Sequence, residues 1–209
     1  MSGATAVLKM IEASPDRPPE PERAAAIDAA LLARHRAGDP EAFPAMYRIH
    51  SVPVYRRLTR ILGPIAERED LLQDVFLGLH RALPRFRGEA QLTTLVHRIA
   101  MNRAYEHLRR QSRRPVSLVD GWYFEEVVGP HASPELQSAA REDLVRVFAC
   151  LARIKPKKRI ALLLRVVEGL AFDDIAKLVD ATPEAVAKRV QHGQRELDAL
   201  LAAAERRRP

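Results

Sequence analysis

The sequence predicts an all-α protein with two helical domains joined by a flexible linker. Apolar residues recur at the three-and-four spacing of a helix in most segments. No segment shows the alternating β-branched pattern of a strand, and a stretch with glycine and proline interrupts the helical periodicity past the middle of the chain. With 209 residues the chain is long enough for one medium domain or two small domains, each able to bury a core.

We expect a disordered tail over residues 1–23 and an N-terminal domain over 24–114, followed by a linker over 115–132 and a C-terminal domain over 133–204. Prolines 15, 18, 19 and 21 disfavour helix in much of the tail. A helix over 24–37 should turn Ile27, Leu31 and Leu32 inward, and Gly38 should end it. The sequence Asp39-Pro40 should start the next helix, because this cap-then-proline order suits a helix start.

A proline then divides the next helical segment. Pro53 should kink or interrupt the helix that starts after Pro40, because it lacks a backbone donor. A further segment over 54–62 should stop at Gly63.

The helix expected over 67–83 has one apolar and one acidic face. The apolar stripe consists of Leu71, Leu72, Val75, Phe76 and Leu79, and the other face carries Glu67, Asp70, Gln73 and Asp74. Such carboxylates could bind a metal or serve acid–base chemistry, or could form a solvated face or a docking surface for a basic partner. A solvated face or a docking surface is favoured over a metal site, because no histidine stands three or four residues from these acids. His80 lies six residues past Asp74.

A basic loop and a basic helix follow. The loop over 84–91 contains Arg85, Phe86 and Arg87, and Gln91 or Thr93 could cap the helix over 94–110. That helix should bury Leu95, Ile99, Ala100, Ala104 and Leu108, and should expose His97, Arg98, Asn102, Arg103, Tyr105, Arg109 and Arg110. Arginines beside aromatic groups suit single-stranded nucleic acid. A basic helix end that complements its own dipole is the alternative; it accounts for Arg109 and Arg110 but not for Arg98 and Arg103.

The C-terminal domain ends in an expected helix-turn-helix. A helix started by Ser133 and Pro134 should run into Ile154, and Pro156 separates it from a helix over 157–168. A helix over 172–179 is then followed by a turn at 180–182, with Thr182 as N-cap and Pro183 and Glu184 in the first turn of the last helix.

The last helix should bury Ala185 or Val186 together with Val190 and Leu197. Its other faces carry Lys188, Arg189, His192 and Arg195. A short helix, a turn and a basic helix form the arrangement that enters the major groove. An ordinary helical hairpin with a solvated basic face is the alternative.

Charge and composition indicate which partners and which cellular compartment the protein is expected to have. The net charge of +7 favours an anionic partner, nucleic acid before membrane. Cys150 is the only cysteine, which excludes a disulfide framework and a cysteine zinc site. The sequence shows neither a signal pattern nor an apolar run of about 18 residues, so we expect a cytoplasmic protein without cofactors and without membrane insertion.

The order of these motifs resembles the bacterial RNA polymerase sigma factors of the extracytoplasmic-function group, a branch of the sigma-70 family. The resemblance rests on residues 37–43, 67–110 and 154–201. It implies a sigma-2-like helical bundle and a sigma-4-like helix-turn-helix domain, in a protein that binds core RNA polymerase, recognises a bipartite promoter and helps to melt it. It also implies no catalytic residues.

The resemblance also implies roles for individual residues. The polymerase clamp would be bound by Asp70, Gln73 and Asp74. The minus-ten element would be opened and held by Arg85, Phe86, Arg87, His97, Arg98, Asn102, Arg103, Arg109 and Arg110. The minus-thirty-five element would be read by Thr182, Glu184, Ala185, Lys188, Arg189, His192 and Arg195. The polymerase flap is a further expected partner, the linker would follow the polymerase cleft with Glu125 and Glu126, and an anti-sigma factor is also expected.

Several residues depart from the family pattern. Leu92 and Leu95 stand where aromatic residues are usual, Asp180 stands in place of a glycine, and Ala171 in place of a serine or threonine cap. Ala185, Ala187 and Lys188 differ from the usual residues of the last helix, which bears on the promoter sequence rather than on the role.

Two other functions are consistent with parts of the sequence. One is a stand-alone helix-turn-helix regulator, which would bind duplex DNA tightly without polymerase. The other is a metal-dependent nuclease using Glu67, Asp70 and Asp74.

Overall fold

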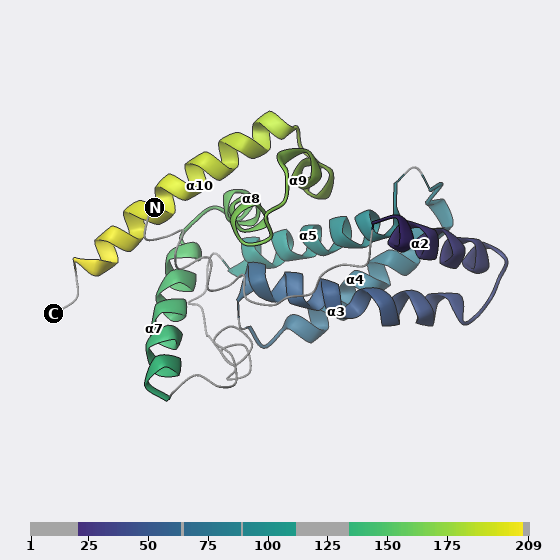
Figure 1. The fold of residues 1–209 in the computed structure, drawn as a ribbon, viewed down its shortest axis with the longest axis horizontal. Coiled ribbons are helices and arrows are strands. Elements are labelled where there is room, and N and C mark those ends of the chain that lie inside the picture. The colour runs from purple at the N-terminus through teal and green to yellow at the C-terminus, as the bar shows by residue number, and fades with distance from the viewer. Residues whose placement is uncertain (1–20, 64, 89, 112–133, 207–209) are drawn as a thin grey trace.

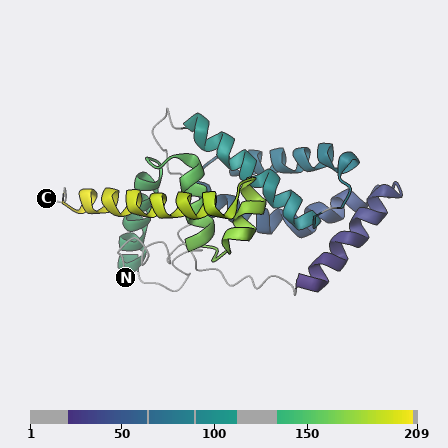
Figure 2. The ribbon, with the colours of Figure 1, turned by 90° about the horizontal axis from the view of Figure 1, so that it is seen from above.

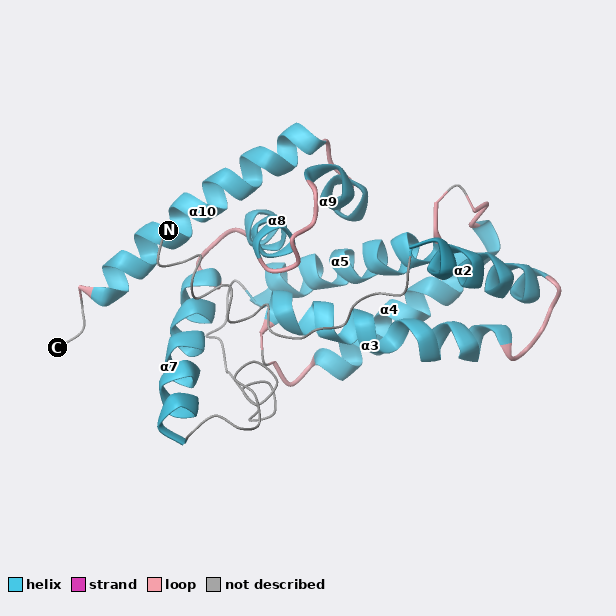
Figure 3. Ribbon diagram, in the orientation of Figure 1, coloured by secondary structure: helices cyan, strands magenta, loops and turns pink. Residues whose placement is uncertain are grey.

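The structure is a computed structural model that describes residues 21–63, 65–88, 90–111 and 134–206. All regular elements of this part of the chain are helices (Figure 3). Most of the expected tail and the whole expected linker, with Glu125 and Glu126, lie outside the described residues. None of the described helices is long and apolar enough to cross a bilayer.

The N-lobe consists of α2 (Pro21–Arg36), α3 (Ala42–Leu62), α4 (Arg68–Ala82), the short η1 (Leu83–Arg85) and α5 (Leu92–Gln111). Helices α3, α4 and α5 pack against one another, and α2 packs on α3 and α5 (Figure 1). The apolar stripe predicted on α4 is buried as expected, in the same hydrophobic core as Met46, Leu58 and Met101.

Two local expectations in the N-lobe are not met. Helix α3 runs through Pro53, so the proline does not interrupt the helix, and the kink expected as the other outcome stays a prediction. Val54 and Leu58, just after the proline, are fully buried, so tertiary packing outweighs the one backbone hydrogen bond that proline removes. Ile27 is 37% exposed, whereas the adjacent Asp28 is buried and hydrogen-bonded.

The C-lobe consists of α7 (Pro134–Leu151), α8 (Pro156–Val166), α9 (Phe172–Val179) and α10 (Pro183–Glu205). Helix α10 packs on α7, α8 and α9 and extends away from α2, as both views show (Figures 1 and 2). A Cβ atom at Gly193 would lie 3.3 Å from the backbone oxygen of Lys158, so a glycine permits the close crossing of α10 over α8. Lys158 and Glu196 form an ion pair beside this crossing.

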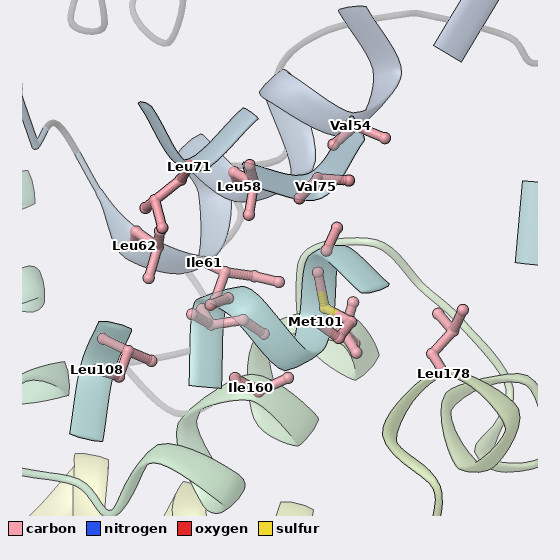
Figure 4. Close-up of a cluster of buried hydrophobic side chains, with 14 of the residues drawn as sticks. Val54, Leu58, Ile61, Leu62, Leu71, Val75, Met101, Leu108, Ile160 and Leu178 are labelled. Atoms are coloured by element: carbon pink, nitrogen blue, oxygen red, sulfur yellow. The ribbon is translucent and has the colours of Figure 1, made fainter. Parts of the chain in front are cut away.

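The two lobes are packed together in a single hydrophobic core. Helix α8 packs on α3 and α5, and α9 packs on α5. Figure 4 shows Ile160 of the C-lobe near Ile61 and Met101 of the N-lobe, with Leu108 of the N-lobe and Leu178 of the C-lobe at opposite sides of the same cluster. All five side chains are buried. The lobes were expected from the sequence, but this contact between them was not.

Candidate nucleic-acid interface

The start of α5 is held by a carboxylate from α2. Asp28 Oδ2 accepts hydrogen bonds from the backbone N–H and the Oγ1 hydroxyl of Thr93, at 2.8 and 2.7 Å. Asp28 Oδ1 lies 3.0 Å from Nε2 of the buried His50. A distant aspartate therefore performs the capping that the sequence suggested for Gln91 or Thr93, and it aligns the helix with the loop before it.

These contacts set the charge state of Asp28. Burial raises its pKa, but the hydrogen bonds from His50 and Thr93 outweigh burial, so that the net pKa lies below the ordinary value of an aspartate. The carboxylate therefore stays ionised inside the lobe, and its negative charge stabilises the positive N-terminal end of α5.

His97 does not lie on the surface of α5. Its side chain is 7% exposed, which shows that the predicted exposure was wrong. Burial, followed by the positive charge of Arg57 and by His50, lowers the pKa of His97 well below the ordinary histidine value, against the opposing effect of Asp28. A neutral, buried imidazole cannot contact DNA from this position, so we leave His97 out of the nucleic-acid surface.

The exposed ridge of α5 carries four of the other predicted residues. Arg98, Asn102, Arg109 and Arg110 are exposed, and the spacing of four and seven places Arg98, Asn102 and Arg109 on one face. Arg103 is half-buried and paired with Glu106 at 2.9 Å. Tyr105, which was expected to be exposed, is half-buried under the ammonium group of Lys157 from α8, 5.6 Å from the ring centre.

The basic loop before α5 is tied to α2. Arg36 Nη2 donates to the backbone oxygen of Phe86 at 3.0 Å. The side chain of Phe86 is half-buried against the core, whereas Arg85 and Arg87 on either side of it are exposed. The loop thus presents two guanidinium groups next to the exposed ridge of α5, which gives the N-lobe a surface suited to phosphates.

The turn between α9 and α10 has the predicted geometry. Asp180 adopts the left-handed conformation, with φ at 47°, and is the C-cap of α9. Thr182 is the N-cap of α10, and its hydroxyl accepts the backbone N–H of Ala185 at 3.3 Å. The backbone N–H of Glu184 and the hydroxyl of Thr182 lower the pKa of the Glu184 carboxyl. Asp tolerates the left-handed region better than most residues, so the turn forms without a glycine.

The outer face of α10 is basic and accessible. Glu184, Lys188, His192 and Arg195 are exposed, as is Thr182, and Ala185 and Arg189 are half-buried beside them. Val186 and Leu197 on the opposite face are fully buried, as predicted, and Val190 is partly buried against the core. Helix α10 therefore has the amphipathic form of a recognition helix, with α9 packed behind its N-terminal half (Figure 1).

The acidic face of α4 is also accessible. Asp70, Gln73 and Asp74 are exposed together with Glu67. The side chain of Leu77, one turn after Gln73 and Asp74, is 54% exposed. No group of three or more His, Cys, Asp or Glu residues in the described ranges is arranged to hold a metal ion. This face combines acids with an exposed apolar side chain, a composition that suits a protein partner.

Three structural residues were missed by sequence reasoning. Asp28 is the one charged residue in the alanine-rich stretch 24–33, and a charged residue on the inward face was the available signal. Gly193 is an isolated glycine inside a helical pattern, which often marks close packing. Arg159 is only 4% exposed. It stands among lysines that remain accessible, so nothing in its sequence context singled it out.

Comparisons with known proteins agree with the fold. Residues 46–114 match sigma-70 region 2, and residues 144–197 match sigma-70 region 4. Among solved structures, CnrH in complex with the cytosolic domain of CnrY superposes with a TM-score of 0.59 at 22% identity, over 85% of this chain and 98% of that one. The sigma factor RpoE of Bartonella quintana, in complex with the anti-sigma factor NepR, gives 0.55 at 17% identity, over 78% of this chain and 98% of that one.

Curated relatives are similar over nearly their whole length. The RNA polymerase sigma-H factor of Pseudomonas aeruginosa is 30% identical over 183 residues, which cover 83% of this chain and 93% of that protein. The ECF RNA polymerase sigma factor SigM of Mycobacterium tuberculosis is 30% identical over 175 residues, which cover 83% of this chain and 84% of that one. The chain therefore belongs to the extracytoplasmic-function group of the sigma-70 family of RNA polymerase sigma factors.

Proposed function

We propose that this sigma factor divides promoter recognition between its lobes, with the N-lobe at the minus-ten element and the C-lobe at the minus-thirty-five element. The supporting observation is that each lobe carries its own exposed basic helix. The ridge of α5 and the outer face of α10 lie on different lobes, and both present basic side chains to solvent: arginines beside an asparagine on α5, and a lysine, a histidine and an arginine on α10. Such side chains contact phosphates and base edges.

In the N-lobe, Arg98, Asn102, Arg109 and Arg110 with Arg85 and Arg87 would bind the opened strand of the minus-ten element. Extruding a base from the duplex costs a few kcal/mol, which contacts of this kind have to offset. Phe86 supplies an aromatic ring in the same loop and Arg103 a further guanidinium, although both are half-buried.

In the C-lobe, α10 would lie in the major groove. Thr182, Glu184, Ala185 and Lys188 are at its N-terminal end, which is the part of a recognition helix that reads bases. Arg189, His192 and Arg195 would contact bases further along or the phosphates beside the groove.

The acidic face of α4 would dock on core RNA polymerase. Asp70, Gln73 and Asp74 present negative charge and an amide next to the exposed Leu77. A basic, partly apolar surface such as a polymerase clamp helix would complement them. We place the protein in the cytoplasm with the polymerase and assign it no catalytic residue of its own. Because the solved relatives are complexes with CnrY and with the anti-sigma factor NepR, we also propose an anti-sigma partner.

The experiment that tests this function is transcription in vitro with core polymerase, with and without the protein, on a pool of genomic promoter fragments. We expect discrete new transcripts whose start sites share two upstream elements. Replacing Lys188 and Arg195 by Ala should weaken transcription from promoters that depend on the upstream element, and Asp74→Arg should weaken binding to the core enzyme. Lys177→Ala, on the exposed side of α9, is the matched control.

Absence of transcripts together with tight binding of the isolated protein to duplex DNA would support the regulator alternative instead. Metal-dependent cleavage of the fragments that Asp74→Asn abolishes would support the nuclease alternative. Either result would overturn the proposal.

A further inference from the structure

The loop between η1 and α5 is bonded to α2 at both of its ends. At its start, Nη2 of Arg36 donates to the backbone oxygen of Phe86 at 3.0 Å. Beyond its end, Oδ2 of Asp28 accepts the backbone N–H and the hydroxyl of Thr93, at 2.8 and 2.7 Å. The loop residues that the structure describes are Phe86, Arg87, Gly88, Ala90 and Gln91. The chain on either side of the exposed loop residues is therefore attached to one and the same helix.

Helix α2 is a firm support for these two attachments. It packs on α3 and α5 (Figure 1), and its Leu31 and Leu32 side chains are buried. Asp28 and Arg36 are eight residues apart, which is roughly 12 Å along the axis of an α-helix. Because a packed helix keeps its length, α2 sets how far apart the two ends of the loop are held.

The attachment at Asp28 cannot turn away easily. Asp28 is only 3% exposed, and its Oδ1 lies 3.0 Å from Nε2 of the buried His50 in α3. Moving the carboxylate would break its bonds to α3 and α5 together, and a buried carboxylate without partners is costly. Since Thr93 lies in the first turn of α5, these bonds set where that helix begins and in which direction it runs.

The chain turns sharply beside the attachment at Arg36. Gly88 has a φ of 87°, a left-handed conformation that glycine adopts without strain, and a Cβ atom there would lie 3.7 Å from Nη2 of Arg36. Phe86 has extended backbone, and its half-buried ring packs against the core. Arg87 is thus exposed between a residue that is anchored by its ring and its carbonyl group and a glycine turn next to α2.

We propose that Arg36 and Asp28 are positioning residues for the minus-ten element, because they hold the η1–α5 loop in the shape that the opened strand binds. This inference rests on the proposed role of the N-lobe at that element. A loop that is held at both ends loses less conformational freedom when the strand binds, so more of the contact energy remains for recognition. The correct strand fits the held loop, whereas a mismatched strand gains little from it.

A direct contact of Arg36 with a phosphate is the competing explanation, because this side chain is exposed. The two roles differ in what they do to binding. Loss of a phosphate contact weakens the binding of all sequences about equally and lowers the salt dependence by about one counterion. Loss of a positioning residue weakens the correct strand more than a mismatched strand and leaves the salt dependence unchanged.

The test measures how the complex of core polymerase with this protein binds two fluorescent single strands. One strand carries the minus-ten sequence deduced from the start sites of the transcripts, and the other is a copy with its central bases exchanged. The ratio of the two dissociation constants is the discrimination, measured by anisotropy at several salt concentrations. Arg36→Met should lower the discrimination about threefold, as loss of one exposed hydrogen bond implies.

Arg34→Met is the matched control. Arg34 is exposed on the same helix and carries the same charge, but it binds Asp39 and not the loop. We expect unchanged discrimination in Arg34→Met and the same salt dependence in both arginine variants. Uniformly weaker binding of both strands by Arg36→Met, with a smaller salt dependence, would show a direct phosphate contact and would overturn the positioning role.

The attachment at Asp28 is tested through Thr93, because replacing the buried carboxylate itself would also destabilise the lobe. Thr93→Val keeps the shape of the side chain and the backbone bond but removes the hydroxyl donor, and should lower the discrimination about fivefold. Thr93→Ser restores a hydroxyl group and should recover most of the discrimination. The double variant Arg36→Met/Thr93→Val should lose less than the product of the two single losses, because releasing one end already frees the loop.

A merely structural role would leave the discrimination unchanged. A variant that is only less stable has a smaller active fraction, which weakens the correct and the mismatched strand equally. Wild-type discrimination in Arg36→Met and in Thr93→Val would overturn the inference, and so would fully multiplicative losses in the double variant. If the wild-type complex gives no transcripts or binds both strands equally, the proposed function itself fails and the inference fails with it.

Discussion

The helix-turn-helix and the N-lobe differ in the sequence range of the interactions that define them. In the helix-turn-helix, Asp180 ends α9 and Thr182 caps α10, so residues within a few positions of each helix end satisfy its backbone. In the N-lobe, the start of α5 is bonded to Asp28, 65 residues earlier, and the end of α3 is bonded to Arg159, 98 residues from Ile61.

This difference in sequence range explains which helix ends could be predicted from the sequence. Local capping residues are visible in a short window of sequence, and the expected bounds of α9 agree with the structure. Long-range capping is visible only once the helices are packed. It also makes the N-lobe more dependent on single buried polar residues, since an unpaired buried group costs more than an unpaired group in water.

The largest effect should come from the long-range cap. Asp28→Ala removes the bonds to Thr93 and leaves His50 without its carboxylate inside the lobe. We expect a loss of about 3 kcal/mol in the free energy of unfolding, measured with urea. Asp39→Ala is the control, because this exposed carboxylate also binds an arginine and a backbone N–H. An equal loss in both variants would contradict the importance assigned to burial.

A glycine tests whether the C-lobe also depends on a long-range contact. Gly193→Val would place a branched side chain against the backbone of Lys158 and against Leu162. We expect a loss of about 2 kcal/mol from overpacking at the crossing of α8 and α10, seen as a lower urea midpoint. Gln191→Val, at an exposed position two residues earlier on the same helix, controls for the helix propensity of valine. Equal losses of stability in Gly193→Val and Gln191→Val would show that close packing at the crossing does not require a glycine.

His97 and His107 should make stability depend on pH, because the folded protein lowers the pKa of both side chains. The pKa of His97 is lowered in the folded protein, so below about pH 6.5 the unfolded chain takes up a proton that the folded chain does not. Stability should therefore fall as the pH is lowered from 7.5 to 5.5, by at most about 1.4 kcal/mol per pH unit for each such group.

His97→Met should flatten this dependence in urea titrations. A smaller dependence should remain, because burial also lowers the pKa of His107. The contribution of Asp28 belongs to a more acidic range, since its lowered pKa keeps it ionised down to pH values below those of an ordinary aspartate. A slope unchanged in His97→Met would contradict the assignment.

The smallest effect should come from the local cap. Thr182→Ala removes one hydrogen bond to the backbone of Ala185 at an exposed helix end, and should cost about 1 kcal/mol. Thermal unfolding measures the change, and Thr182→Ser should restore most of the stability because serine is an equally good N-cap. If Thr182→Ala lost as much stability as Asp28→Ala, the local cap would be as important as the long-range cap, and the difference between the two regions would be contradicted.

The exposed part of the candidate site could largely be predicted from the sequence. Lys188, His192 and Arg195 on α10, and Arg98 and Asn102 on α5, are exposed as their helical spacing indicated. His97 was predicted wrongly because its polarity and its place next to Arg98 indicated an exposed position, whereas its burial depends on the packing of α2 and α3. The interruption expected at Pro53 does not occur for a similar reason, since the buried residues after it stabilise the helix through tertiary contacts.

The sequence by itself determined the all-helical class, the helix-turn-helix with its turn and cap, and the basic faces of the two lobes. These features depend on spacing and on residues close in the chain, so they do not require the packing to be known. The tertiary structure alone decided that Asp28 caps α5, that His97 is buried and neutral, and that Arg159 and Glu168 join the lobes. Those contacts join residues far apart in the chain, and only packing shows which polar groups lose their water and must find a protein partner.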